Sequence, residues 1–236
     1  DVDELRGFLG APADAAPSFL LLSEPFSFGR ATLAFLELLN AAYPGRPALG
    51  GLASAGEQPG QNLLLFEGQV LRTGLVGVAL WGAVELQPVV SQGCRPIGGQ
   101  LVVTSAEQNV IRELGGRAAL TVLTDILRDC RPRDLELART RGLLIGRAIS
   151  DPQVADGLSD YLIRNPIDFD QESGAIAIND IVREGETVQF HVRDGVSADE
   201  DLEMLLLAGR RRQAAGALLF SCNGRGTRLF SYRHHD

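Results

Sequence analysis

Short apolar runs, each closed by glycine, proline or polar residues, constrain the fold of this chain more than any other feature of its sequence. Residues 18–22 form such a run and are typical of a buried strand. Residues 30–43 carry leucines at helical spacing, and Pro44 with Gly45 ends that pattern. Residues 48–52 predict a second strand. The order strand, helix, strand indicates an α/β fold.

A glycine turn predicts a hairpin in the next region. Glu67 and Gly68 separate the apolar runs 62–66 and 69–81, and glycine accepts the positive φ that tight hairpin turns need. Residues 84–90 continue the β pattern. We therefore expect an antiparallel sheet with one covered face over residues 62–90.

The second half of the chain alternates predicted strands and helices. Residues 101–105 and 109–114 suit a hairpin, and residues 117–130 carry an apolar stripe of helical period. Residues 131–141 are charged and suit a short helix or a linker. Further strands are expected at 143–149, 161–164, 175–178, 187–192 and 217–220, the last of them buried. These runs imply a second sheet, mixed or antiparallel.

The best-defined helix signal begins at Ser197. Ser197 and Glu200 match a capping box, and the acidic residues 199–201 lie where the helix dipole favours negative charge. Arg210, Arg211 and Arg212 are expected at the other end of this helix.

An internal similarity predicts two related halves. Residues 19–23 and 217–221 are both apolar runs that end in serine, with a glycine a few residues later. We expect an α/β (α+β) fold of two similar halves, each a largely antiparallel or mixed sheet covered by helices. The halves are expected to stack as α-β-β-α layers with pseudo-two-fold symmetry, as domains 1–90 and 91–236.

Charge and composition exclude several classes of function. The formal net charge of -8 argues against nucleic acid as a partner, because phosphate binding needs a clustered positive face. No apolar run approaches the roughly 20 residues that span a bilayer, so membrane insertion is not expected, and no signal peptide is visible. The three cysteines are widely spaced and odd in number, which favours a reducing, cytoplasmic location over a disulfide framework or a metal site.

Residues 91–98 read Ser-Gln-Gly-Cys-Arg-Pro-Ile-Gly and predict a rigid loop. A residue before proline is extended, and Gly93 and Gly98 permit sharp entry and exit. Arg95 suits a ligand carboxylate, and an equally good interpretation makes it a structural tie to a loop carbonyl or an Asp. Cys94 beside Arg95 suits a reactive thiolate, but a cysteine enzyme also needs a base, and His191 is better explained as a half-exposed structural histidine in a strand.

Several motifs, taken in order, resemble the FIST family, a sensory module with N-terminal and C-terminal regions found in bacterial signalling proteins and eukaryotic F-box proteins. The matching pieces are Gly50-Gly51-Leu52-Ala53-Ser54, Gln61-Asn62, Gln92-Gly93-Cys94-Arg95-Pro96-Ile97-Gly98, Glu113-Leu114, Ala118-Ala119-Leu120 and Cys222-Asn223-Gly224-Arg225-Gly226. The family extends further at both ends, so the N-terminal region is expected to be partial and the C-terminal region to lack its last strands. The resemblance implies a cytoplasmic sensory module for signal transduction, with no established catalysis and no cofactor.

We expect a sensory module that binds a small molecule, an amino acid or another small carboxylate, near the seam of the two halves. The predicted ligand-binding residues are Gly51, Ser54, Asn62, Cys94, Arg95, Gly98, Cys222, Asn223, Arg225 and Gly226. Gly224-Arg225-Gly226 suits an anion nest, and a tight turn set by backbone geometry explains it as well. A protein partner or signalling output domain is also expected. No catalytic residue or metal site is expected.

Two alternatives stay open from the sequence. One is an interaction or scaffold subunit of a larger assembly, and the other is a cysteine-dependent enzyme that uses Cys94 or Cys222.

Overall fold

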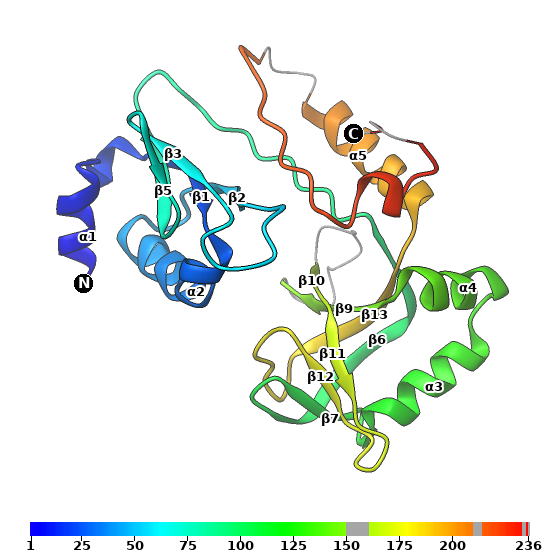
Figure 1. The fold of residues 1–236 in the computed structure, drawn as a ribbon. Coiled ribbons are helices and arrows are strands. Elements are labelled where there is room, and N and C mark those ends of the chain that lie inside the picture. The colour runs from blue at the N-terminus through cyan, green and yellow to red at the C-terminus, as the bar shows by residue number, and fades with distance from the viewer. Residues whose placement is uncertain (150–160, 210–213, 233–234, 236) are drawn as a thin grey trace. The chain divides into compact units, whose positions relative to one another are not determined.

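The structure is a computed structural model that describes residues 1–149, 161–209, 214–232 and 235. The chain divides into two compact units (Figure 1). The first unit holds residues 1–88 and 218–220, and the second holds residues 89–217 and 221–236. Both combine sheets with helices, which confirms the α/β class. No helix in the described part of the chain is long and apolar enough to cross a membrane.

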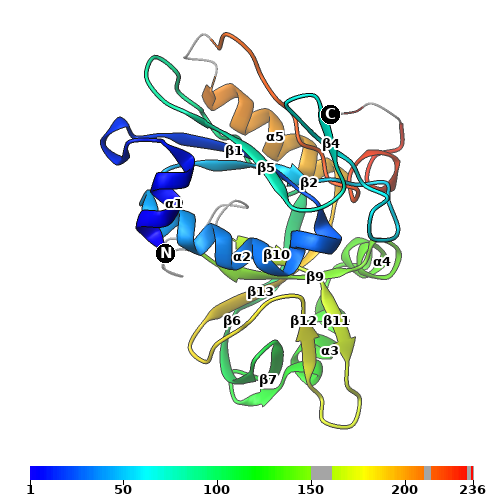
Figure 2. The same cartoon turned by 60° about the vertical axis from the view of Figure 1, so that its left-hand side comes forward.

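The first unit is a small mixed sheet with one covered face (Figure 2). The central strand β1 (Ser18–Ser23) pairs in parallel with β2 (Ala48–Leu52) and antiparallel with β5 (Leu75–Leu80). The helix α2 (Pro25–Ala42) connects β1 to β2, and α1 (Val2–Leu9) packs against α2. A short turn of 3-10 helix, Ala13–Ala15, follows α1.

The predicted hairpin is confirmed as β3 (Leu64–Phe66) and β4 (Gln69–Leu71). Its turn residues Glu67 and Gly68 have φ of 48° and 74°, the conformation that a two-residue turn of this kind requires.

The helix α2 begins five residues earlier than the leucine spacing predicted. Glu24 caps it by accepting a hydrogen bond from the Ser27 N–H at 2.7 Å, and Pro25 stands at the first helical turn, where its missing N–H costs nothing. The start of α2 is therefore set by its capping residues, Glu24 and Pro25, and cannot be read from the apolar pattern alone.

Aromatic packing covers the inner face of the first sheet. Phe19 and Tyr43 have ring centroids 5.0 Å apart, and the Tyr43 hydroxyl donates to the Ala11 carbonyl oxygen at 2.8 Å. The opposite face of the sheet is apolar and more open, with Leu22 40% and Val78 52% exposed. Residues on one strand alternate between faces, so β1 buries Phe19 on one side and presents Leu22 on the other.

The second unit is built on one long antiparallel sheet with the strand order β10-β9-β13-β6-β7-β12-β11. These strands are β6 (Cys94–Glu107), β7 (Val110–Leu114), β9 (Leu143–Ala148), β10 (Tyr161–Arg164), β11 (Pro166–Phe169), β12 (Ile176–Ile178) and β13 (Thr187–Arg193). A two-residue strand β8 (Arg117–Ala118) pairs with β7. The far strand β11 also approaches β9, so the sheet curls back on itself.

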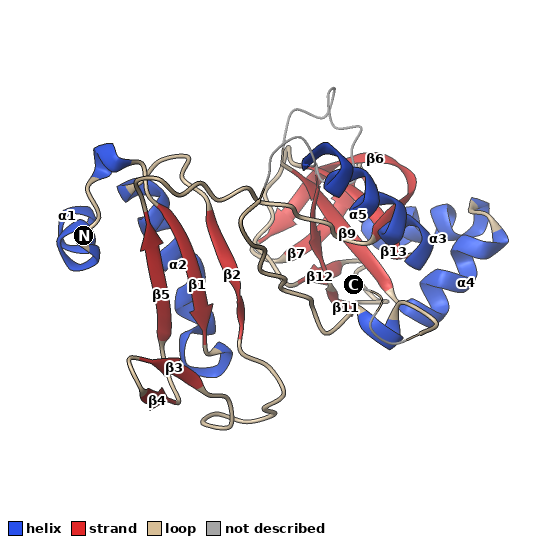
Figure 3. Ribbon diagram, turned by 90° about the horizontal axis from the view of Figure 1, so that it is seen from above, coloured by secondary structure: helices blue, strands red, loops and turns tan. Residues whose placement is uncertain are grey.

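The described part of this unit also contains the helices α3, α4 and α5. The helices α3 (Ala119–Asp129) and α4 (Pro132–Arg141) lie together on one side of it (Figure 3), and α5 (Gly195–Gly209) contacts β6. A 3-10 turn, Gly226–Arg228, follows near the C-terminus. The helix expected over 117–130 is confirmed as α3, although it begins at Ala119. Residues 131–141, expected as a short helix or a linker, form the helix α4. The hairpin of β6 with β7 and the strands near 143, 161, 176 and 187 are confirmed as well.

The expected loop at 91–98 is wrong, because β6 begins at Cys94 and runs through Arg95 and Pro96. Among the described strands, β6 pairs only with β13 in this part, and proline is tolerated on such an edge. Gly98 has φ of 66°, and the register with β13 shifts around it. The glycine therefore makes a bulge within a strand and does not end a loop.

Two further strand predictions are wrong, and the strands β8 and β11 were not predicted. Residues 84–90 and 217–220 contain no strand, and Leu218 and Leu219 are 70% and 69% exposed. An apolar run makes a strand only where a partner strand supplies the ladder, and none is described beside these runs. The strand β11 was missed because its proline and aspartate resemble a turn.

The start of α5 also corrects a prediction. Asp194 accepts hydrogen bonds from the Val196 N–H at 3.3 Å and the Ser197 hydroxyl at 3.1 Å, so it caps the helix. The capping box of Ser197 with Glu200 is therefore wrong, and Ser197 lies inside the first turn. Arg210, Arg211 and Arg212 lie outside the described residues.

Gly50 gives a stability prediction for the first unit. A Cβ at Gly50 would lie 1.7 Å from the Leu21 carbonyl oxygen, so Gly50→Ala cannot keep β2 paired with β1. We expect Gly50→Ala to lower the free energy of unfolding by about 2–4 kcal/mol in urea denaturation. The control Gly51→Ala, whose Cβ would lie 3.4 Å from Phe220, should cost less than about 1 kcal/mol. Equal losses in the two variants would contradict this account.

Candidate functional site

Arg95 ties three elements of the second unit together. Its Nη2 donates to Asp134 Oδ1 of α4 at 2.5 Å, and its Nε donates to Asp194 Oδ2 before α5 at 3.1 Å. Arg131 donates a further hydrogen bond of 3.1 Å to Asp134, and Arg133 donates one of 3.0 Å to Asp194. The Arg95 guanidinium is thus engaged by two protein carboxylates, which is the structural tie that the sequence left open.

The pKa directions follow from this network. Hydrogen bonding to Arg95 holds the pKa of Asp134 below its usual value. Burial alone would raise the pKa of Asp194, but hydrogen bonds from Arg95 and Ser197 hold it below its usual value. Both carboxylates are therefore charged at neutral pH, and each one is buried with its countercharge.

Cys94 is a buried thiol that stays protonated at neutral pH. Burial raises its pKa to about 11, and this outweighs the opposing effect of Arg193 and Arg225. The Sγ atom donates to the Gln92 carbonyl oxygen at 3.3 Å. A nucleophilic cysteine needs the thiolate, so this environment does not favour the cysteine-enzyme alternative.

The turn at residues 222–226 packs against the start of β6. A Cβ at Gly93 would lie 3.1 Å from Arg225 Nη1, and a Cβ at Gly224 would lie 2.7 Å from Arg193 Nη1. Arg193 faces Cys94 across the pair β6 and β13. Two guanidinium groups therefore gather beside Cys94, and Asp201 of α5 is close enough to act on the same thiol. We call Arg193, Arg225 and Asp201 the charged cluster.

Aromatic contacts fix the position of Arg225. Its guanidinium carbon lies 5.3 Å from the centroid of the Phe230 ring, a cation–π distance. The other partner of Phe230 is His235, stacked at 3.6 Å between centroids. Phe230 also joins Ala198 and Leu229 in a small buried cluster, so the turn is anchored to α5.

The structure brings together only some of the predicted site residues. Cys94, Cys222 and Arg225 lie near one another, and Asn223 and Gly226 belong to the same turn. Arg95 neighbours Cys94 in β6 but is occupied by Asp134 and Asp194. A Cβ at Gly98 would lie 3.0 Å from Ile126 of α3, so Gly98 serves packing. These assignments to ligand binding stay predictions.

Gly51, Ser54 and Asn62 belong to the first unit and have local roles there. Gly51 lies in β2, and Ser54 is exposed in the loop that follows. Asn62 is buried, accepts from the Gly56 N–H at 2.9 Å and donates to Glu24 Oε1 at 3.0 Å. The Gln61-Asn62 pair therefore braces its own loop, with Gln61 accepting from the N–H groups of residues 57 and 58.

Sequence reasoning missed Glu24, Arg193 and Asp201. Burial would raise the pKa of Glu24, but hydrogen bonds from Asn62 and Ser27 hold it below its usual value. The signal for Glu24 was its place before Pro25, a common N-cap position. Arg193 and Asp201 gave no local signal, because only the pairing of β13 with β6 and the docking of α5 place them beside Cys94.

His191 is a buried neutral histidine. Its pKa is lowered to about 4, mainly by burial, and Nδ1 contacts the Gln189 carbonyl oxygen at 2.9 Å. The Tyr161 ring packs edge-on at 5.1 Å. The half-exposed position expected for this structural histidine is therefore corrected to a fully buried one.

Comparison with known proteins finds the FIST family along nearly the whole chain. The FIST N domain matches residues 2–117, and the FIST C domain matches residues 119–236. These matches meet near residue 118, whereas the compact units divide near residue 88, so the expected boundary at 90/91 stays a prediction. No solved structure matches.

Curated relatives come from mycobacteria. "Uncharacterized protein Rv0628c" of Mycobacterium tuberculosis is 44% identical over 224 residues, which is 92% of this chain and 56% of that protein. "Uncharacterized protein Mb0898c" of Mycobacterium bovis is 41% identical over 220 residues, with the same two shares. The chain thus spans about half the length of the curated relatives it matches.

A prediction for Arg95 compares its buried ion pairs with an exposed ion pair of Arg112. Arg95→Ala leaves two buried carboxylates without their main countercharge, so the free energy of unfolding should fall by about 3 kcal/mol in urea denaturation. Arg112→Ala removes an exposed pair with Glu107 and should cost less than about 1 kcal/mol. A loss below about 1 kcal/mol in Arg95→Ala would show that the network does not hold these elements together.

His191 gives a prediction for pH. Its pKa is lowered from 6.5 to about 4, so the unfolded chain binds the proton first and stability falls as pH drops from about 6.5 towards 4. Between pH 7 and 4.5, wild type should lose about 2–3 kcal/mol more than His191→Leu, measured by denaturant titration at each pH. Carboxylate titration is common to both proteins and cancels in the difference. Parallel pH profiles would contradict a buried neutral His191.

Proposed function

Because this chain belongs to the FIST family, whose domains are sensory and signalling modules, we propose that it binds a small ligand at the charged cluster of the second unit. The proposed ligand is an amino acid or another small carboxylate. The proposal includes a cytoplasmic location and an output partner that reads the bound state.

One observation carries this proposal, namely the convergence of Arg193 and Arg225 beside a neutral thiol. Among the described residues, no carboxylate forms an ion pair with Arg193. A planar guanidinium suits a carboxylate, which it binds through parallel N–H donors. Gly93 and Gly224 allow the backbone to approach both arginines, and a side chain at either position would require the guanidinium group to shift.

Asp201 favours an amino acid over a simple acid at this place. It is buried in α5 and acts on the Cys94 thiol, so its carboxylate belongs to the same charged cluster. Two cations with one anion complement the carboxylate and ammonium groups of an amino acid. Cys222 and Asn223, which are exposed, would border the ligand from the turn.

A second candidate function is that of an interaction subunit. The observation that favours it is the open apolar face of the first sheet, where Leu22 and Val78 are 40% and 52% exposed. Apolar faces of this kind mark contact surfaces for other proteins.

Thermal-shift screening tests the proposed function. The twenty amino acids and a set of small carboxylates, each at 10 mM, are added to the 236-residue chain, and at least one should raise its Tm by a few degrees. Arg193→Gln should weaken the apparent affinity for that compound about tenfold or more, because one charged hydrogen-bonding partner is lost.

The matched control is Arg112→Gln, which removes the same charge from β7, outside the charged cluster, and should leave the shift unchanged. A shift that is equal in wild type and Arg193→Gln contradicts the charged cluster as the site. If no compound raises the Tm, the small-ligand function is contradicted and the interaction function is favoured.

A further inference from the structure

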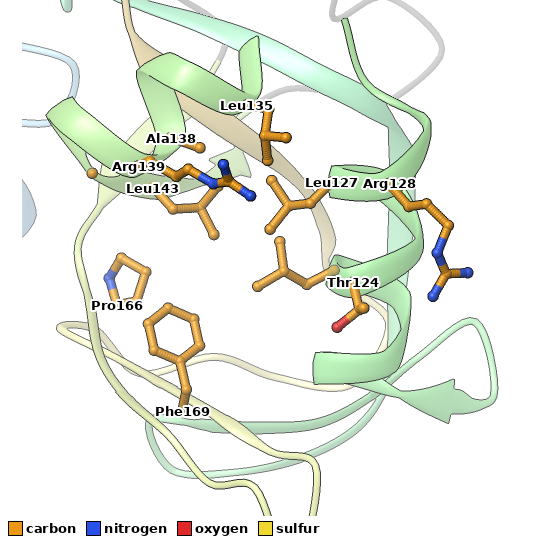
Figure 4. A pocket seen from close by; sticks show the side chains of 11 residues that line it. Thr124, Leu127, Arg128, Leu135, Ala138, Arg139, Leu143, Pro166 and Phe169 are labelled. Atoms are coloured by element: carbon orange, nitrogen blue, oxygen red, sulfur yellow. The ribbon is translucent and has the colours of Figure 1, made fainter. Parts of the chain in front are cut away.

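The second unit contains an open cavity of about 750 Å³ between α3, α4 and β11 (Figure 4). Leu123 and Leu127 reach it from α3, Leu135 from α4, and Phe169 from β11. Its volume is in the range of cavities that hold small organic molecules, about 300–1,000 Å³. The cavity lies within one unit, and its lining shares no residue with the charged cluster.

The local fold explains why this cavity exists. The strand β11 curls towards β9, while α3 and α4 diverge from the short connection at Cys130 and Arg131. The helix α3 has one buried apolar face, and Leu127 at its edge is only partly covered. The space between the helix pair and β11 therefore keeps an apolar wall that these three elements do not fill.

The charge at the rim has one sign. Arg128 and Arg139 line the cavity, and none of the described residues that line it is acidic. Arg128 is already paired with Asp125 at 3.0 Å, whereas no carboxylate of the described residues pairs with Arg139. In Figure 4 the Arg139 guanidinium is directed towards Leu127 and Leu135, and Arg128 points away from the cavity. A single cation over an apolar wall complements a ligand that has an apolar body and one negative group.

We propose that this cavity binds an organic acid with an apolar body and one carboxylate, with Arg139 pairing with the carboxylate and Leu127 and Phe169 packing against the body. An amino acid fits less well, because its ammonium group would meet an arginine and no acid. The large apolar body and the missing ammonium group distinguish this ligand from the amino acid favoured at the charged cluster, where Asp201 supplies the negative charge. The inference therefore goes beyond the proposed function.

Calorimetric titration with 2-naphthoate tests this site. The probe combines a rigid aromatic body with one carboxylate, and it should bind the 236-residue chain with a submillimolar Kd. Arg139→Gln should weaken binding about tenfold, roughly 1.4 kcal/mol, because the charged partner is lost. Phe169→Ala should weaken binding of 2-naphthoate and of the neutral 2-naphthalenemethanol alike.

Controls make each outcome decisive. Arg112→Gln removes an equivalent charge from the hairpin of β6 and β7 and should leave binding unchanged. Arg139→Lys, which keeps the charge, should recover part of the affinity and guards against a folding defect. Absence of binding or equal binding by Arg139→Gln would overturn the proposal. So would binding of 3-(2-naphthyl)alanine to Arg193→Gln, in which the charged cluster is disabled, as tight as that of 2-naphthoate.

Discussion

The ion pairs of Arg95 with Asp134 and Asp194 are the constraint on which the second unit depends. Burying these charges is costly, and it becomes tolerable because the planar Arg95 guanidinium engages both carboxylates, with further bonds from Arg131 and Arg133. Asp194 also caps α5, so the same network fixes the start of β6, the first turn of α4 and the first turn of α5. An error in any of these positions would leave a buried charge unpaired.

This constraint also decides which arginines lie beside Cys94. Neighbouring residues of a strand face opposite sides, so the commitment of Arg95 to α4 and α5 leaves Cys94 facing a different environment. Arg193, opposite Cys94 in the ladder, and Arg225, from the turn after α5, occupy that environment. The two neighbouring residues therefore have different roles. Arg95 stabilises the fold through its ion pairs, and Cys94 lies beside the charged cluster.

Local rules were sufficient where a boundary depends on nearby residues, as in the hairpin turn of Glu67 with Gly68 and the helices α3 and α4. They failed where the pairing with a distant strand decides whether a segment forms a strand. Residues 94–98 became a strand because β13 lies alongside, and the equally apolar residues 217–220 did not. Arg225 and Cys94 were predicted at one site, but their neighbours Arg193 and Asp201 come from distant elements that no local pattern joins. The α-β-β-α layering of the halves stays a prediction.

The protonation state of Cys94 matters for any anion at the charged cluster. A thiolate there would cancel one of the two guanidinium charges and repel a carboxylate, whereas a thiol with a pKa of about 11 leaves their field intact at neutral pH. Burial of the sulfur, which weakens the case for a nucleophile, therefore strengthens the case for a binding site. The same reasoning distinguishes the two proposed sites, because the nearby Asp201 admits an ammonium group that the cavity beside Arg139 would repel.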